Sequence, residues 1–367
     1  MSFMKHFENL PDPRSHINRR HDLLDIMFLC VAATLSGAEG WKDIKTFGDS
    51  KLGWLRKFRG FEAGIPVDDT IARVVSSLNP QRFLKYFVSW VNEIRDEQGH
   101  EHIAIDGKTL RRSFHKGRRN DALHMLSVWV SGADLFFSGA KSKAKKNEVE
   151  TVLELIEMLE VKGTVITLDA MSTQRAVAEK IKQKQGDYIL ALKGNQGKLH
   201  KEVKAYFHKC HRDNELGEDP HYREVEKGHG RIEERHYTQL PVSAWIEQSR
   251  HWSGLQSVIE VTRVRHIDDK TSSETQYYIS SLAVDVKACA KHIRQHWGVE
   301  NKVHWVLDMT FREDESRIRR GEGAEIVAMI RRFCLNLARL NSTKDSVRSK
   351  LKRVSWNDDF REAILFS

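Results

Sequence analysis

Two aspartates stand directly after short apolar runs, in positions from which carboxylates project at one edge of a β-sheet. Asp106 ends the run 102–106 (HIAID) and Asp169 ends the run 164–169 (TVITLD). Either residue alone is equally well explained as a turn or helix cap. On neighbouring strands, however, the two carboxylates would converge, and converging carboxylates suit Mg²⁺, which prefers oxygen ligands. Two such ions about 3.5–4 Å apart can promote an in-line phosphodiester displacement.

A third acid is expected from a helix that follows the last strand. The segment 296–308 (HWGVENKVHWVLD) places Trp297, Glu300 and His304 on one helical face, so Glu300 is the predicted third ligand. Asp308 is the main alternative. Glu300 could also be a solvated residue paired with Lys302 or Arg294.

The elements that must position these acids are predicted from hydrophobic periodicity between residues 102 and 192. Strands are predicted at 102–106, 125–130, 134–138, 164–169 and 188–192, with helices at 147–159 and 173–184. The order βββ-α-β-α-β is typical of an α/β (α+β) fold, a ribonuclease H-like mixed sheet with flanking helices. In that fold the first and fourth strands are neighbours, which would bring Asp106 beside Asp169.

The rest of the chain is predicted to form two additions to this core. Residues 1–100 have helical periodicity throughout and form a predicted N-terminal helical domain, which leaves 101–367 as the catalytic domain. A β-rich insertion is expected at about 195–283, with strands at 222–225, 235–239, 256–266 and 275–281. Helices are expected at 286–303 and 324–341.

The charge of the chain favours a polyanionic partner such as nucleic acid. With 367 residues, a formal net charge of +9 and a pI of about 9.2, the chain is large enough for a substantial core and basic enough to attract phosphate. Polar and basic residues near the acids are the predicted DNA contacts: Lys108, Arg111, Arg112, Lys193, Asn195, Gln196, Arg317, Arg319 and Arg320. Contacts of this kind neutralise phosphate without reading sequence. A solvated surface charge is the simpler explanation of any single lysine or arginine, and a polar turn after Gly194 explains Asn195 and Gln196 almost as well.

Several other function classes find little support. The four cysteines are widely spaced, which indicates a reducing, cytoplasmic setting. No apolar run follows the first charged residues, so no secretory signal is expected. The protein is expected to be associated with the nucleoid when it is bound to DNA. The apolar segment 23–38 is short for a membrane span and contains Asp25, so it is predicted to be a buried helix. The group His208, Cys210 and His211 lacks the spacing of a zinc finger, and Gly107-Lys108-Thr109 lacks the glycines of a nucleotide-binding loop.

Several longer motifs together resemble the ISAs family of insertion-sequence transposases, which includes the H-repeat-associated proteins. The residues that carry the resemblance are 103–113 (IAIDGKTLRRS), 167–174 (TLDAMSTQ), 191–196 (ALKGNQ), 228–235 (GHGRIEER) and 296–314 (HWGVENKVHWVLDMTFRED). It continues through 316–321 (SRIRRG) and 330–337 (IRRFCLNL), and it extends back to 68–79 (DDTIARVVSSLN) in the helical segment. The resemblance therefore covers nearly the whole chain.

This resemblance implies a DDE transposase whose three acids correspond to Asp106, Asp169 and Glu300, with two Mg²⁺ or Mn²⁺ ions as cofactors. It also implies DNA cleavage at element ends, transfer of the freed 3′-OH into target DNA and a homodimer on double-stranded DNA. No Ser or Tyr nucleophile is needed. The sequence departs from the family at Ser172, where Gly is more frequent. It also lacks the Tyr-x2-Arg-x3-Glu-x6-Lys signature of related transposases: around Glu300, the positions of the Tyr, Arg and Lys are occupied by Ile293, His296 and Leu307.

Two alternative functions share the same predicted core. A catalytically decayed or domesticated copy would keep DNA binding without the reaction. A structure-specific nuclease would cut branched DNA without joining ends.

Overall fold

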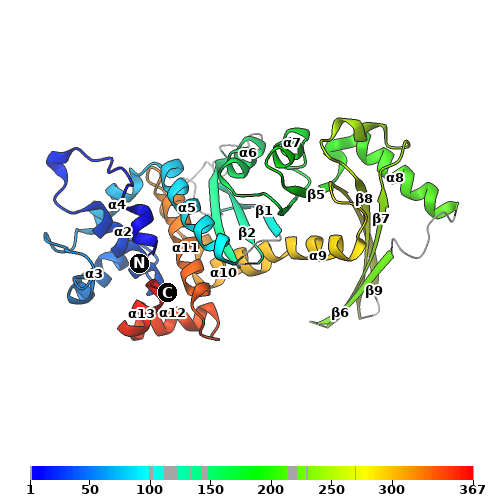
Figure 1. Cartoon of the computed structure of the whole chain (residues 1–367). Coiled ribbons are helices and arrows are strands. Elements are labelled where there is room, and N and C mark those ends of the chain that lie inside the picture. Colours follow the sequence, from blue (N-terminus) through cyan, green and yellow to red (C-terminus); the bar gives the residue numbers. More distant parts are fainter. Residues whose placement is uncertain are drawn as a thin grey trace. The chain divides into compact units, whose positions relative to one another are not determined.

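The computed structural model describes residues 2–98, 102–110, 123–132, 134–142, 148–213, 221–228, 230–268 and 270–366. The predicted DNA contacts Arg111 and Arg112 lie outside these ranges. The chain forms two compact units (Figure 1): unit 1 is Met1–Gly99, Gly107–Thr151 and Val299–Ser367, and unit 2 is His100–Asp106 and Val152–Gly298. Unit 1 is therefore assembled from three separate stretches of sequence.

The N-terminal part of unit 1 is helical, as its periodicity predicts. Its helices are α1 (Ser2–Phe7), α2 (Leu23–Leu35), α3 (Trp41–Leu55), α4 (Asp68–Ser76) and α5 (Pro80–Gln98), with a short 3₁₀ turn at His16–Asn18. Helix α2 begins where the Asp22 side chain accepts hydrogen bonds from the backbone N–H groups of Leu24 and Asp25. Nearly all of α2 is buried, which explains an apolar composition on every side of the helix. Among the described residues, no helix is both long and apolar enough to cross a membrane.

The C-terminal part of unit 1 supplies the helix on which the N-terminal helices pack. It contains a π-helical segment η6 (Val299–His304), α10 (Trp305–Thr310), a 3₁₀ turn η7 (Glu313–Glu315), α11 (Gly323–Leu340), α12 (Val347–Trp356) and α13 (Asp358–Leu365). Helix α11 contacts α2, α4 and α5, and it also covers strand β3 (Figure 1). The buried Asn336 side chain joins α11 to β3 through hydrogen bonds with the backbone N–H (2.8 Å) and C=O (2.5 Å) of Phe136.

The predicted strand order is confirmed. Unit 1 holds the antiparallel pair β2 (His124–Val130) and β3 (Leu135–Ser142), and the order there is β3-β2-β1. Strand β1 (His102–Thr109) passes from unit 2 into unit 1 after Asp106. In unit 2, β1 lies parallel to β4 (Val165–Leu168), which lies parallel to β5 (Asp187–Leu192). The order 3-2-1-4-5 is the one expected of a ribonuclease H-like sheet, with α6 (Glu148–Met158) and α7 (Arg175–Gln183) as the connecting helices.

The predicted β-rich insertion continues this sheet. After a 3₁₀ turn η4 (Gly194–Gln196) and α8 (Gly197–Arg212) come β6 (His221–Gly228), β7 (Arg231–Pro241), a 3₁₀ turn η5 (Glu247–His251), β8 (Ser257–Ile267) and β9 (Lys270–Ser280). Strand β9 pairs with β5, so the order in unit 2 is β1-β4-β5-β9-β8-β7-β6. Strands β6, β7 and β9 are longer than predicted, because their outer ends are polar and exposed and therefore show no apolar alternation.

The helix predicted at 286–303 is shorter in the structure. Helix α9 (Val286–His296) ends before Gly298, and the π-helical segment begins at Val299. Glycine is unfavourable inside a helix, which accounts for a change of helical geometry at this point. The residue predicted as third acid therefore lies on the π-helical segment and not on the regular helix.

Candidate active site

The register of β1 and β4 places the first two predicted acids directly after the last paired residues of the two strands, although β1 continues to Thr109 and is longer than the predicted 102–106. Ile105 is paired with Leu168 across the parallel ladder, and Asp106 and Asp169 are the next residues on each chain. Both aspartates are half-buried. Neighbouring parallel strands are about 4.8 Å apart, so two carboxylates that follow paired residues begin from adjacent backbone positions. The register therefore sets the backbones of the two aspartates side by side, as the predicted neighbouring strands require, and the convergence of their carboxylates stays a prediction.

The loop after Asp169 is tied to that carboxylate. The backbone N–H of Ser172 donates to Oδ1 of Asp169 (3.1 Å), and the Thr173 hydroxyl bridges the carbonyls of Asp169 (3.0 Å) and Ala191 (2.7 Å). Ser172 is buried and is not among the residues with a positive φ. The conformation of this turn therefore does not require glycine, and the departure at Ser172 leaves the turn intact.

Asn195 and Gln196 hold the same loop from the end of β5. The Asn195 side-chain amide donates to the carbonyl of Ala170 (2.5 Å), and the Gln196 amide donates to the carbonyl of Thr173 (3.0 Å) and to the Gln174 side chain (3.1 Å). The sequence predicted DNA contacts for both residues, and it gave no sign of this bracing. The signal that could have found it is the position of a polar pair directly after a strand that adjoins the strand of Asp169.

A half-buried histidine, His296, connects the helix before Glu300 to the strand that precedes Asp169. Nδ1 of His296, at the end of α9, lies 2.9 Å from the hydroxyl of Thr167, and Nε2 of His102 lies 2.9 Å from the same hydroxyl. Burial lowers the pKa of His296 to about 4 and holds that of His102 well below its usual range, so both rings are neutral at pH 7. Thr167 lies two residues before Asp169, which makes this contact a brace within unit 2.

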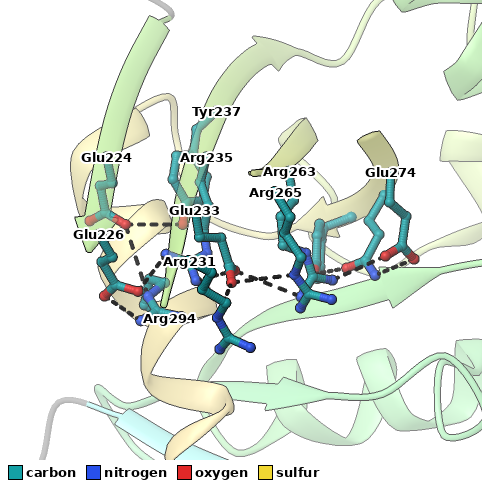
Figure 2. Close-up of polar contacts among 12 residues, drawn as sticks. Glu224, Glu226, Arg231, Glu233, Arg235, Tyr237, Arg263, Arg265, Glu274 and Arg294 are labelled. Carbon is teal, nitrogen blue, oxygen red and sulfur yellow. Dashed lines mark hydrogen bonds and ion pairs between the residues drawn. The ribbon is translucent and has the colours of Figure 1, made fainter. Parts of the chain in front are cut away.

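A network of arginines and glutamates holds α9 against the inserted strands (Figure 2). Arg294 of α9 donates to Glu226 of β6 (2.6 Å), which also accepts from Arg235 of β7 (2.9 Å). Arg235 in turn pairs with the buried Glu233, which lies 3.3 Å from Arg265 of β8. Burial raises the pKa of Glu233, but the surrounding guanidiniums outweigh burial and keep it below its ordinary value. The network therefore fixes α9 as a unit with β6, β7 and β8.

Glu300, the predicted third acid, lies exposed on the π-helical segment in unit 1, whereas Asp106 and Asp169 belong to unit 2. π-helical turns occur mostly as local insertions in α-helices and are frequent at functional sites. In the described part of the chain, no three His, Cys, Asp or Glu side chains are grouped as a metal site. The structure thus brings together two of the three predicted acids by strand register and places the third on its own segment.

The alternative third acid, Asp308, is part of an ion-pair cluster in unit 1. Lys108 pairs with Asp308 and with Glu313 (3.1 Å), and Arg332 of α11 binds both oxygens of Glu313 at 2.6 and 3.4 Å. Lys108 and Glu313 are buried, and Arg332 is fully buried. Burial raises the pKa of Asp308, an effect that Lys108 partly opposes. Lys108, a predicted DNA contact, thus lies in an internal cluster together with the alternative acid.

The remaining predicted DNA contacts follow β5 in unit 2 and η7 in unit 1. Lys193 is exposed at the end of β5, and Arg317, Arg319 and Arg320 follow η7 in a loop of unit 1. Cys210 is buried, and His211 pairs with Glu260 (2.7 Å). The His211 ring is thus within hydrogen-bond distance of a carboxylate.

Comparison with known proteins defines the class of this chain. Residues 97–337 match the family model described as Transposase DDE domain, and residues 4–91 match the DDE_Tnp_1-associated family. The chain belongs to the DDE transposase family, and it is a DDE transposase by class of enzyme.

Its relatives include H-repeat-associated proteins, as the motifs predicted. The chain is 40% identical over its whole length to a protein named putative transposase YncI of Escherichia coli O157:H7, of which it covers 95%. It is 38% identical to the H repeat-associated putative transposase YhhI of E. coli K12, with 99% of this chain and 97% of that protein covered. A piggyBac transposase synaptic complex with hairpin DNA matches at a TM-score of 0.48 and 12% identity, over 100% of this chain and 78% of that chain.

Proposed function

We propose that this protein is the transposase of an insertion sequence, which hydrolyses phosphodiester bonds at the element ends and transfers the resulting 3′-OH into target DNA. The observation that carries the proposal is the register of β1 and β4, which sets Asp106 and Asp169 side by side in a chain of the DDE family. Family membership supports action on DNA. Cleavage and strand transfer are the finer statement that we infer from the acids.

Asp106, Asp169 and Glu300 would hold two Mg²⁺ or Mn²⁺ ions. The two aspartates supply hard oxygen ligands from neighbouring strands, at the positions after the paired residues Ile105 and Leu168, which fits the preference of these cations. When bound, such ions activate the attacking oxygen and stabilise the leaving oxygen. The residues of the chain keep the ligands in place: Ser172 orients the Asp169 carboxylate, Asn195 and Gln196 hold its loop, and His296 braces the helix that leads to Glu300.

Basic and polar residues near the acids would contact the phosphate backbone of double-stranded DNA at the terminal repeats and the target. Lys193, Arg317 and Arg320 have exposed side chains, consistent with that role. We further propose that the protein acts in the cytoplasm on the nucleoid, as a homodimer on paired ends, with the segment 1–100 in end recognition or dimerisation. Light scattering of the protein with and without terminal-repeat DNA measures the oligomer directly.

The deciding experiment is Mg²⁺-dependent joining of a labelled terminal-repeat oligonucleotide to a plasmid, by the unmodified protein and by Asp169→Asn. Joining should be lost in Asp169→Asn while DNA binding remains. Asp187→Asn is the matched control, because Asp187 begins β5 and so lies at the opposite edge of the parallel strands. Normal joining by Asp169→Asn would overturn the assignment.

The same assay separates the alternatives. Cutting of branched DNA without joining of ends would identify a nuclease. Specific binding without either reaction, with an active transposase working in the same buffer, would identify a decayed DNA-binding protein.

A further inference from the structure

A cleft of about 990 Å³ within unit 1 is lined largely by arginines. Its walls come from the start of α3, from α4, from the loop 312–321 and from α11. The arginines of this lining are Arg312, Arg317, Arg319, Arg320 and Arg331. Three of them were predicted DNA contacts, but Arg331 of α11 was not.

Arg331 is the buried charge of the cleft. It is 3% exposed, and in the described part of the chain its hydrogen bonding consists of one long contact, 3.4 Å, to the backbone carbonyl of Glu39. Its neighbour Arg332 is also buried but binds both oxygens of Glu313 and the carbonyl of Ala328. A guanidinium has five N–H donors, so Arg331 has donor capacity that a bound anion could use. Burial lowers the pKa of Arg331, an effect that Glu313 and Glu39 partly oppose.

The loop that presents the other arginines is fixed against α4. The backbone N–H of Glu322 donates to the carbonyl of Ser76 (3.1 Å), and Gly321 has a φ of +51°. A Cβ atom at Gly321 would lie 2.7 Å from the Ser76 carbonyl oxygen, so a side chain there would displace the loop. The arginine wall is therefore preorganised by backbone contacts.

Most of the acids in the lining already have partners. Arg312 pairs with Glu39 (3.1 Å) and Glu315 (2.5 Å), and Asp43 accepts from the backbone N–H groups of Glu39 and Gly40 as a helix cap. Asp69, in the first turn of α4, is the remaining acid of the lining. The exposed Asp69 carboxylate therefore weakens the positive potential that the arginines give to the cleft.

We propose that this cleft binds a backbone phosphate of DNA, with Arg331 as its principal ligand. The inference rests on the proposed function, since it assigns to the same DNA substrate a second contact region in unit 1. The cleft volume is many times that of a single phosphate group, which favours a nucleotide of a polymer over a free anion. Guanidinium groups bind phosphate oxygens in a bidentate manner, which suits a buried and preorganised arginine.

The test is the fluorescence anisotropy of a labelled 30-bp duplex titrated with full-length protein over a range of NaCl concentrations. Arg331→Met should weaken binding about tenfold or more at low salt and reduce the slope of log K against log salt by about one, the value for one lost phosphate contact. Arg331→Lys should lie in between, because it keeps the charge but loses the planar fork. Asp69→Asn should bind DNA more tightly than the unmodified protein. This variant alters a helix surface and not a buried group, so it tests the cleft even if Arg331→Met folds poorly.

Arg348→Met, which removes the same charge from an exposed position on α12, is the matched control and should cost far less affinity. Equal loss in Arg348→Met and Arg331→Met would show an effect of net charge alone and overturn the proposal. Unchanged DNA affinity in both folded Arg331→Met and Asp69→Asn would also overturn the proposal. So would binding of millimolar inorganic phosphate in the cleft that leaves the affinity for DNA unchanged. Absence of DNA binding by the unmodified protein would instead overturn the proposed function.

Discussion

Asn195 and Gln196 show how two uncharged side chains can hold the loop that follows Asp169, the carboxylate that we propose as a metal ligand. Their amides reach back from the end of β5 to the carbonyls of Ala170 and Thr173, so the loop after Asp169 is held from the neighbouring strand. Polar pairs at strand ends are usually interpreted as surface or ligand contacts. Here the hydrogen bonds give them a positioning role, which is compatible with an additional contact to DNA.

We predict that Asn195→Ala lowers the rate of end joining by about 10- to 100-fold, because small displacements of reacting groups have effects of this size. The concentration of Mg²⁺ needed for half-maximal joining should rise, since the Asp169 loop would be less ordered. The comparison is Gln183→Ala, which removes an amide that bonds to Glu179 on the exposed face of α7. An unchanged metal requirement in Asn195→Ala would contradict the positioning role.

Buried histidines make the stability of unit 2 dependent on pH. Because burial lowers the pKa of His296 to about 4, the unfolded chain binds a proton between pH 6.5 and 4 that the folded chain does not. Stability is therefore complete above pH 6.5 and falls as the pH drops toward 4, by on the order of 3 kcal/mol for this residue. His102, on the other side of Thr167, acts in the same direction.

The prediction is that His296→Gln has a flatter dependence of stability on pH between 6.5 and 4, and that urea unfolding at several pH values measures it. Glutamine can still bond to Thr167 but does not titrate. His251→Gln, at the exposed turn η5, should leave the slope unchanged. An equally steep slope in His296→Gln would show that other groups cause the acid sensitivity.

At the scale of elements, the segment after Glu300 is held by a charged cluster inside unit 1. Glu313 of η7 receives Arg332 from α11 and Lys108 from β1, and all three side chains are buried. The two cations outweigh the effect of burial and lower the pKa of Glu313 to about 2. Removing one member of such a cluster is costly because it leaves a buried charge without a partner.

Glu313→Gln should therefore lower the free energy of unfolding by about 3–5 kcal/mol, as seen for broken buried ion pairs. Thermal and urea unfolding of the full chain provide the measurement. Glu315→Gln, two residues later, is the control, because Glu315 is exposed and pairs with the exposed Arg312; it should cost less than about 1 kcal/mol. Equal costs would show that the cluster contributes no more than a surface pair.

The strands and helices of the core were predictable because their side chains follow simple periods. The runs before Asp106 and Asp169 are mostly apolar and rich in β-branched residues, and such runs between turn residues indicate buried strands. The π-helical segment at Val299–His304 was not predictable, since its sequence has the same pattern as a regular helix. The bracing by Asn195 and Gln196 was also missed, because polar residues that bond to backbone carbonyls have no characteristic spacing. Arg331 was missed because an arginine inside a helical pattern gives no sign that it lines a cleft.

At the scale of the molecule, unit 1 is discontinuous in sequence. Helix α11, near the end of the chain, packs on α2, α4 and α5, which lie within the first hundred residues. Helix α2 is buried along nearly its full length, so without α11 much of its apolar surface would face water.

We therefore expect a fragment of residues 2–98 to lack stable structure by itself. Circular dichroism and the dispersion of its amide NMR resonances would show it. In a second experiment, a peptide spanning residues 299–366 is added to the 2–98 fragment. If α11 completes the fold, the helical circular dichroism of the mixture should exceed the sum of the two separate spectra. A fragment with the cooperative melting of a folded domain would contradict this expectation.

This arrangement has a consequence for synthesis on the ribosome. The first helices leave the exit tunnel long before residues 323–340 are translated, so they must wait for their partner while some 220 further residues are made, on the order of 10–40 s at typical bacterial elongation rates. During that time the apolar surface of α2 is a target for chaperones and proteases. A stop codon anywhere before α11 would release a chain that cannot finish unit 1, and such a truncated product would be degraded before it could compete with the complete protein for DNA.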